Sequence, residues 1–277
     1  MNSSEVGCYK TNGYFLLKNF FNLEVVKRII GDAKSVFLKQ FVYKDYASTD
    51  STVDNISESD FNELLFRLFN EDIETYTNCG KQSQHLISLH ALALHQKTIS
   101  LLHDLGLVLP AISTRPVIFF NHPKLAIRKV FHTVEAHQDW RSMQGSLNAV
   151  VLWLPLVDIG KDLGALQVLP GSHLGGLRTD HIEYGFGMVK LTDEENSRLV
   201  SVEVTRGDAL IFSSFLIHQS GNNNTNRPRW SCHFRYNDLN EEAFIARKYA
   251  HAYIYKPIEE LITPDFPSID LIKNTFT

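Results

Sequence analysis

The hydrophobic positions of this chain follow a helical period in about the first 110 residues and a strand-like period afterwards. In segment 23–41, Val25, Val26, Ile29 and Ile30 recur at the spacing of one helix face, and Asn22 stands where an N-terminal cap is expected. Helical patterns also occupy residues 59–76 and 84–106, and the NGYFLLKNFF of residues 12–21 predicts a turn, a short strand and a helix start. The first part of the chain is therefore predicted to be mostly helical.

From about residue 115 to 236 the pattern changes to short runs rich in β-branched and aromatic residues. Turn signals such as Asn121–Pro123 and Pro170–Gly171 separate these runs. The runs are PVIFF, LAIRKVF, NAVVLWLPL, ALQVLP, SVEVT, DALIFSS and RWSCHFRY. Helices followed by evenly spaced strands predict an α+β fold, mainly β in its core, with N-terminal helices backing an antiparallel sandwich or barrel.

The chain shows no internal repeat and no low-complexity linker, so we expect a single domain over residues 1–277. Within it, residues 1–110 are expected to give helical support, residues 111–240 to form the β core, and residues 241–277 to form a C-terminal extension. A chain of 277 residues is long enough for one large β-rich domain.

Composition and charge narrow the classes of partner. The net charge of −4 gives no electrostatic reason to expect a nucleic acid or an anionic membrane. The three widely spaced cysteines fit a reducing compartment better than a disulfide framework. No apolar stretch approaches the roughly 20 residues that span a bilayer, and the N-terminus lacks the pattern of a signal peptide. We expect a cytoplasmic protein whose partner is a small molecule.

The stretch EAHQDWRSMQGS, residues 135–146, contains a candidate metal site. If its backbone is extended, His137 and Asp139 point the same way, although an isolated pair of this kind is more often a surface ion pair. In a sandwich that closes on itself, His218, at the end of a later extended segment, can join them. Two imidazoles and one carboxylate leave coordination positions open, as in non-haem Fe(II) oxygenases.

Arg229 lies inside the apolar run RWSCHF, where a buried charge needs a partner. A dicarboxylic acid bound in the barrel could supply one, because a guanidinium grips a carboxylate with two parallel hydrogen bonds. An internal salt bridge to an aspartate or glutamate is the alternative. The sequence leaves both interpretations open at this point.

Six segments in this order resemble the phytanoyl-CoA dioxygenase family of Fe(II)/2-oxoglutarate-dependent oxygenases. They are NGYFLLKNFF, HQDW, GSLNAVVLWLPLVD, GALQVLPGSH, GDALIFSSFLIHQSGNN and RPRWSCHFRY, and together they extend from about residue 13 to 237. The resemblance implies a double-stranded β-helix, which is a cupin-like jelly roll, backed by the N-terminal helices.

The resemblance also assigns roles to individual residues. It implies three iron ligands, His137, Asp139 and His218. It implies that Arg229 pairs with the 5-carboxylate of 2-oxoglutarate, that Ser220 helps to hold it, and that Trp153 lies near this cosubstrate. Arg128 is the nearest candidate for a further basic side chain that reaches the cosubstrate from an earlier strand.

The implied reaction uses Fe(II), 2-oxoglutarate and O2 to hydroxylate an unactivated C–H bond of a small metabolite, with release of succinate and CO2. The carboxylate of Asp139 favours hydroxylation, desaturation or ring formation over halogenation. The candidates for substrate contact near the iron are Gln138, Trp140 and Arg141. The substrate is expected to be polar, and a carrier-tethered substrate stays open.

Two alternatives compete with this hypothesis. A cupin-type metal-binding protein or isomerase would keep the three ligands but would have no use for Arg229. A catalytically inactive relative that serves as a scaffold would be free to lose the ligands, which are intact here.

Overall fold

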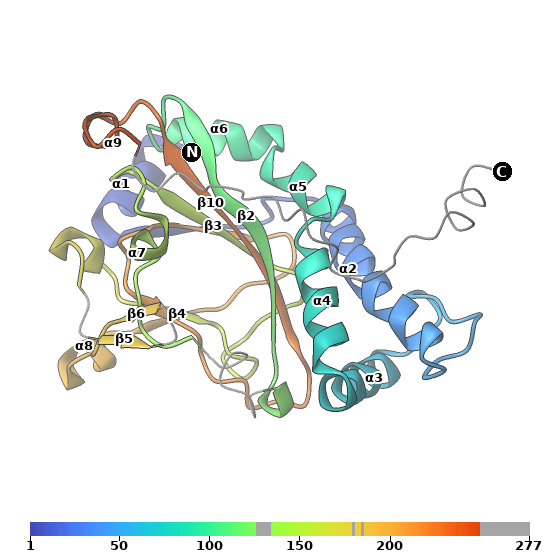
Figure 1. Ribbon diagram of the computed structural model, residues 1–277. Coiled ribbons are helices and arrows are strands. Elements are labelled where there is room, and N and C mark those ends of the chain that lie inside the picture. Colours follow the sequence, from blue (N-terminus) through green and yellow to red (C-terminus); the bar gives the residue numbers. More distant parts are fainter. Residues whose placement is uncertain (126–133, 179–180, 184–185, 250–277) are drawn as a thin grey trace.

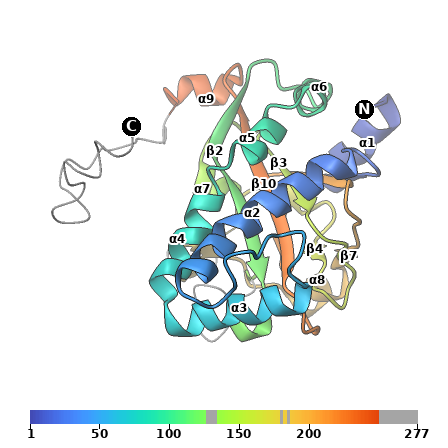
Figure 2. The same ribbon diagram turned by 90° about the vertical axis from the view of Figure 1, so that its right-hand side faces the viewer.

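The computed structural model describes residues 1–125, 134–178, 181–183 and 186–249. Figure 1 shows the long strands of one sheet lying between a layer of helices and a group of shorter strands. In Figure 2 the helices α2, α3 and α4 lie in front of that sheet and cover it. The molecule therefore has three layers, with a site possible between the two groups of strands.

The helical part contains one strand and six helices. They are α1 (Ser3–Asn12), β1 (Tyr14–Leu17), α2 (Leu23–Tyr43), α3 (Glu58–Glu71), α4 (Ile73–Ser83), α5 (Ile87–Ala93) and α6 (Gln96–Asp104). The predicted cap of α2 is confirmed, because the Asn22 side chain accepts a hydrogen bond from the Glu24 amide at 2.9 Å.

The helix boundaries depart from the hydrophobic pattern at three places. Segments 59–76 and 84–106 are each two helices, because Asp72 and His95 cap new helices by accepting hydrogen bonds from the amides of Thr75 and Lys97. Helix α1 was not predicted, since it buries no residue and carries no apolar face.

The major sheet is antiparallel and has the strand order β1-β8-β3-β10-β2. Its later strands are β2 (Pro110–Asn121), β3 (Val150–Pro155), β8 (Ala209–Ser213) and β10 (Arg229–Asp238). Strand β1 lies in the part predicted to be helical support, yet it pairs with β8 along its whole length. The N-terminal segment is thus an edge of the core sheet.

The minor sheet has the order β7-β4-β9 and consists of short strands. They are β4 (Leu166–Val168), β7 (Val200–Val202) and β9 (His218–Gln219). His137 extends this sheet, because it bridges His218 on one side and Met188 of β6 (Phe186–Met188) on the other, and β6 pairs with β5 (His181–Glu183). Short helical turns complete the described chain: η1 (Pro123–Leu125), α7 (Trp140–Met143), η3 (Ser172–Gly175), α8 (Asp193–Ser197) and α9 (Glu242–Ala246). The predicted double-stranded β-helix is confirmed.

Alternation along the strands separates two apolar cores. Outward-facing residues of the major sheet pack on the helices, and those of β10 are Trp230, Cys232, Phe234 and Tyr236. The ring of Phe37 in α2 lies 5.5 Å from that of Phe120 and 6.4 Å from that of Trp230. A second cluster lies between the two sheets and includes Val151, Trp153, Leu166 and Val168. The helices bury the outer face, so the inner face of the major sheet is available to a functional site.

Some predictions fall on residues outside the described ranges. Most of the run LAIRKVF does so, and of the expected C-terminal extension the structure describes residues up to Tyr249. In the ranges that are described, no helix has both the length and the apolar character that a bilayer crossing requires.

Candidate functional site

The residues His137, Asp139 and His218 meet at the junction between the minor sheet and helix α7. The amide of His137 donates to the carbonyl of His218 at 3.0 Å, and the amide of His218 donates back at 3.1 Å. Asp139 differs from expectation, because it is not extended: its φ of −62° and ψ of −28° make it the residue that precedes α7. The chain therefore turns after His137, and the carboxylate returns toward the histidines through this turn.

The three side chains have the geometry of a metal site. The Nε2 atom of His137 lies 3.8 Å from Oδ1 of Asp139, and the Nε2 atom of His218 lies 4.0 Å from Oδ2. One ligand atom from each residue lies within 4.8 Å of the others. This is the only group of three or more such ligands among the residues that the structure describes.

Backbone carbonyls set the orientation of both imidazoles. Nδ1 of His137 lies 2.7 Å from the carbonyl of Glu135, and Nδ1 of His218 lies 2.9 Å from that of Leu216. If each Nδ1 donates its hydrogen there, each Nε2 presents a lone pair to the centre. Burial, followed by the proximity of His137, lowers the pKa of His218 to about 3, so His218 is in the neutral form that binds metals.

Arg235 holds the carboxylate. Its guanidinium donates to Oδ1 of Asp139 at 2.8 Å. Burial alone would raise the pKa of Asp139, but the positive charge of Arg235 and its hydrogen bond outweigh this effect, so the pKa lies well below its usual range. Asp139 is therefore a fixed anion in the ligand set.

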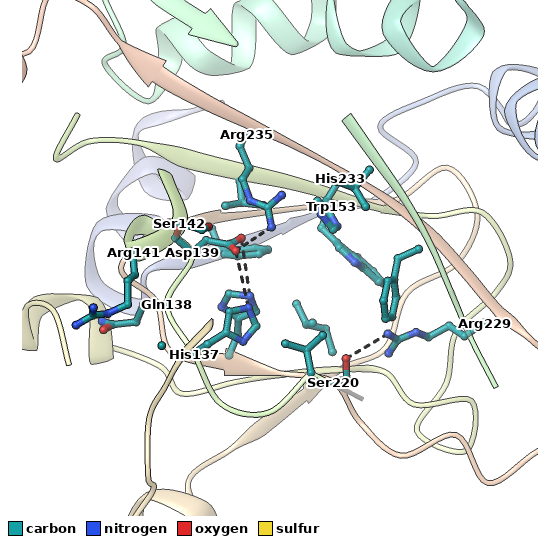
Figure 3. A pocket seen from close by; sticks show the side chains of 18 residues that line it. His137, Gln138, Asp139, Arg141, Ser142, Trp153, Ser220, Arg229, His233 and Arg235 are labelled. Carbon is teal, nitrogen blue, oxygen red and sulfur yellow. Dashed lines mark hydrogen bonds and ion pairs between the residues drawn. The ribbon is translucent and has the colours of Figure 1, made fainter. Parts of the chain in front are cut away.

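The metal centre opens into a cavity of about 360 Å³ between the two sheets. Figure 3 shows His137 and Asp139 on one side of it and Arg229 on the other. Arg229 is 2% exposed, and its guanidinium donates to the carbonyl of Gly164 and, at 3.3 Å, to Oγ of Ser220. Its Nε has no hydrogen-bond partner, and no salt bridge to Arg229 occurs in the described ranges.

The environment of Arg229 bears on the two interpretations left open by the sequence. Burial lowers the pKa of Arg229 to about 10, and among the described residues no carboxylate opposes the effect. A buried, charged guanidinium with spare donors is suited to an anion that enters the cavity. The internal salt bridge is therefore not found within the part of the chain that the structure describes.

The other residues expected near the cosubstrate have different positions. Ser220 and Trp153 line the same cavity as Arg229. Trp153 lies on β3, opposite His233 of β10, and is 4% exposed. Arg128 lies outside the described residues, so its predicted role stays a prediction.

The three residues expected to contact substrate do not behave alike. Arg141 and Gln138 line the cavity, and Trp140 is not among its lining residues. The Gln138 carboxamide is already committed to the backbone: it donates to Gly176 and Phe215 and accepts from the Arg178 amide. Trp140 stacks on Phe215 with a centroid distance of 5.1 Å.

Two cavity residues were missed by the sequence reasoning. His233 and Arg235 lie on β10 at two-residue spacing and share its inner face with Arg229. The signal was present in RWSCHFRY, where polar residues alternate with apolar ones. Burial lowers the pKa of His233 well below its ordinary value, so His233 is a neutral polar group in the cavity wall.

A family model and several curated relatives match this chain. A family model for phytanoyl-CoA dioxygenase matches residues 9–231. The peroxisomal phytanoyl-CoA dioxygenase of Mus musculus is 25% identical over 254 residues, which cover 83% of this chain and 67% of that protein. The phytanoyl-CoA dioxygenase domain-containing protein 1 homolog of Dictyostelium discoideum is 24% identical over 268 residues, which cover 84% and 91%.

Solved structures share the fold. The epimerase SnoN in complex with Fe3+, alpha ketoglutarate and nogalamycin RO superposes with a TM-score of 0.58 at 17% identity, over 93% of each chain. EctD from S. alaskensis with 2-oxoglutarate and 5-hydroxyectoine gives a TM-score of 0.53 at 16% identity, over 87% of this chain and 78% of EctD.

Proposed function

This chain belongs to the phytanoyl-CoA dioxygenase family, and from that premise we propose that it is a non-haem Fe(II)/2-oxoglutarate-dependent oxygenase. It hydroxylates an unactivated C–H bond of a small metabolite, and 2-oxoglutarate and O2 are converted to succinate and CO2 as the substrate gains one oxygen atom. One observation carries the proposal: the triad of His137, Asp139 and His218 shares a cavity with the buried guanidinium of Arg229, which has no carboxylate partner in the described chain.

The donor set suits the proposed metal. Two imidazoles and one carboxylate are the ligands of non-haem Fe(II) oxygenases, and the three side chains leave other coordination positions open. His137 and His218 would bind through Nε2, because their Nδ1 atoms face backbone carbonyls. Arg235 keeps Asp139 ionised and oriented.

Arg229 and Ser220 would hold the distal carboxylate of 2-oxoglutarate. The unpartnered Nε of Arg229 and the neighbouring Ser220 hydroxyl supply donors at one end of the cavity, while His137 and Asp139 lie at the other side. When bound, Fe(II) and 2-oxoglutarate supply the activation of O2 for oxidation of a C–H bond. The protein orients the reactants and surrounds them with apolar walls that limit the access of water.

Hydroxylation is the outcome we propose among those open to this centre. The carboxylate of Asp139 occupies the position that a halide would need, so halogenation is disfavoured. A cupin-type isomerase without 2-oxoglutarate would bury Arg229 at a large cost and gain nothing from it. The substrate is a small molecule, either free or tethered to a carrier.

We also propose a reducing, cytoplasmic location. Cys8, Cys79 and Cys232 are all free thiols, and the latter two are buried. Burial raises the pKa of the Cys79 thiol to about 11, which suits an unreactive core residue.

Anaerobic titration tests the proposed function. Protein loaded with Fe(II) is titrated with 2-oxoglutarate, and we expect the weak visible charge-transfer band of the chelate to appear at one equivalent. His137→Ala and His218→Ala should lose iron binding, since each removes one of three protein ligands. If iron binds but 2-oxoglutarate produces no band, the cupin-type alternative is favoured. If both alanine variants bind iron and turn over like the parent protein, the triad is wrong.

A further inference from the structure

Arg141 is a cavity residue with no partner in the described structure. It lies in α7, two residues after Asp139, and its half-buried side chain lines the cavity. The Nε atom of Arg141 is buried without a hydrogen bond, and neither a hydrogen bond nor an ion pair joins its side chain to any residue whose placement is described. Arg229 and Arg235, by contrast, each donate to protein groups.

The position of Arg141 separates it from the cosubstrate end of the cavity. In Figure 3, Arg229 and Arg141 lie on opposite sides of His137 and Asp139. If 2-oxoglutarate extends from the metal centre to Arg229, it cannot also reach Arg141. The second guanidinium is therefore available to the other reactant.

The charges of the cavity lining favour an anion there. Among the lining residues that the structure describes there are three arginines and one carboxylate, namely Arg141, Arg229, Arg235 and Asp139. Fe(II) and 2-oxoglutarate carry equal and opposite charges, so binding both leaves this positive excess in place. In a cavity with mostly apolar walls, such an excess is costly unless a further anion enters.

We propose that the substrate carries a carboxylate and that Arg141 binds it, which makes Arg141 a specificity-determining residue. This inference rests on the proposed function. A single planar guanidinium matches a carboxylate with two parallel hydrogen bonds, whereas a phosphate would call for more donors than the described residues supply at this end of the cavity. Gln138 does not compete for the anion, because its carboxamide is used by the backbone.

The remaining walls define the rest of the substrate. The apolar lining includes Val117, Val134, Val151 and Leu166. A compact, apolar carbon skeleton fits such walls, and the carboxylate at Arg141 would direct one of its C–H bonds toward the metal centre. The inferred substrate class is thus a small carboxylic acid with an apolar body.

Matched pairs of ligands test the inference. Anaerobic protein with Fe(II) and saturating 2-oxoglutarate is titrated with a panel of small carboxylic acids and with the primary amide of each acid. A ligand near the metal should shift the charge-transfer band, whereas displacement of 2-oxoglutarate would remove it. We expect acids, but not their amides, to shift the band. Arg141→Gln should weaken binding of such an acid about ten-fold or more, because a charge-assisted hydrogen bond is lost.

Two variants serve as controls. Arg141→Lys keeps the charge without the planar fork, so its affinity should lie between those of the parent and the glutamine variant. Arg28→Gln makes the same chemical change on the exposed surface of α2 and should leave the titration unchanged. Both, like Arg141→Gln, should form the band with 2-oxoglutarate alone.

The failures of the two proposals are distinguishable. A parent protein that forms no band with Fe(II) and 2-oxoglutarate overturns the proposed function and this inference with it. If the parent protein forms a normal band but no acid shifts this band more effectively than its amide, the inference about Arg141 is wrong and the proposed function is not affected. The same holds if Arg141→Gln binds the acid as tightly as the parent protein does.

Discussion

Arg229 is the residue whose substitution best separates cosubstrate binding from metal binding. Arg229→Lys keeps the charge but loses the two-pronged fit to a carboxylate, so we expect the KM for 2-oxoglutarate to rise about ten-fold or more. Arg229→Ala should raise it further. Fe(II) affinity without cosubstrate should change little, because Arg229 lies across the cavity from His137 and Asp139. An unchanged KM in Arg229→Ala would favour the cupin-type alternative.

Substitution of Arg235 tests how far metal affinity depends on a residue that is not itself a ligand. Arg235→Gln removes the charged donor to Asp139, and we expect metal affinity to fall about 10–100-fold, the usual cost of losing a partner of a ligand. Repulsion between the guanidinium and the metal acts in the opposite direction. We expect orientation of the buried carboxylate to dominate, since Arg235 is the partner that holds it there.

Calorimetric titration with Mn(II) measures the Arg235 effect without turnover. Arg229→Gln is the matched control, because it removes a guanidinium from the same strand and the same cavity without touching a ligand. Equal Mn(II) affinities for Arg235→Gln and the parent protein would show that Asp139 needs no help from Arg235.

At the residue scale, the sequence pointed to functional side chains where a polar or charged residue is unusual for its surroundings. Arg229 stood out as a charge inside an apolar run, and His137 and Asp139 as a pair of donors. Arg235 did not, because its partner Asp139 lies 96 residues away in the sequence. Contacts of this kind depend on the register of β10 against its neighbours, which a single sequence does not specify.

At the scale of elements, periodicity located helices and strands but not their ends. Asp72 and His95 interrupt continuous helical patterns because each caps a new helix, and a cap involves one polar residue that the apolar period ignores. The same limit explains why the backbone at Asp139 differs from the expected strand. The alternation rule placed it on a strand beside His137, whereas the described backbone turns into α7 there.

The helical layer and the site share strand β10, and this gives an element-scale prediction. Phe37 of α2 is fully buried against Phe120 and Trp230. Phe37→Ala should lower the free energy of unfolding by about 3–5 kcal/mol, the usual range for a buried phenylalanine. Urea unfolding followed by tryptophan fluorescence measures it. Tyr43→Ala, on the exposed end of the same helix, is the control and should cost far less.

At the scale of the whole molecule, closure of the sheets brings distant segments together. The sequence allowed His218 to meet His137, but only the antiparallel hydrogen bonds between these two residues place the rings 4.2 Å apart. The evenly spaced strands predicted a sandwich or barrel, and the resemblance to a known family narrowed it to a double-stranded β-helix. The participation of β1 in the major sheet followed from neither, because its partner β8 lies nearly 200 residues away in the sequence.

Stability of the metal-free protein should fall as the pH is lowered from about 7.5 to 5.5. Burial depresses the folded-state pKa of His218 to about 3 and that of His233 well below its ordinary value. A histidine in the unfolded chain has a pKa of about 6.5. Below that pH the unfolded chain binds protons that the folded protein excludes. Each such histidine therefore lowers the free energy of unfolding by up to about 1.4 kcal/mol per pH unit.

Thermal unfolding of chelator-treated protein at the two pH values tests this expectation. Carboxylates contribute little in this window, because their pKa is about 4 in the unfolded chain and lower still at folded-state groups such as Asp139, so both states are ionised there. His218→Asn should reduce the decrease in Tm between pH 7.5 and 5.5 without removing it, since His233 remains. His85→Gln, at an exposed position, should behave like the parent protein. If His218→Asn retained the full pH dependence, His218 would have to be readily protonated in the folded protein, and its burial could not keep it in the neutral, metal-binding form.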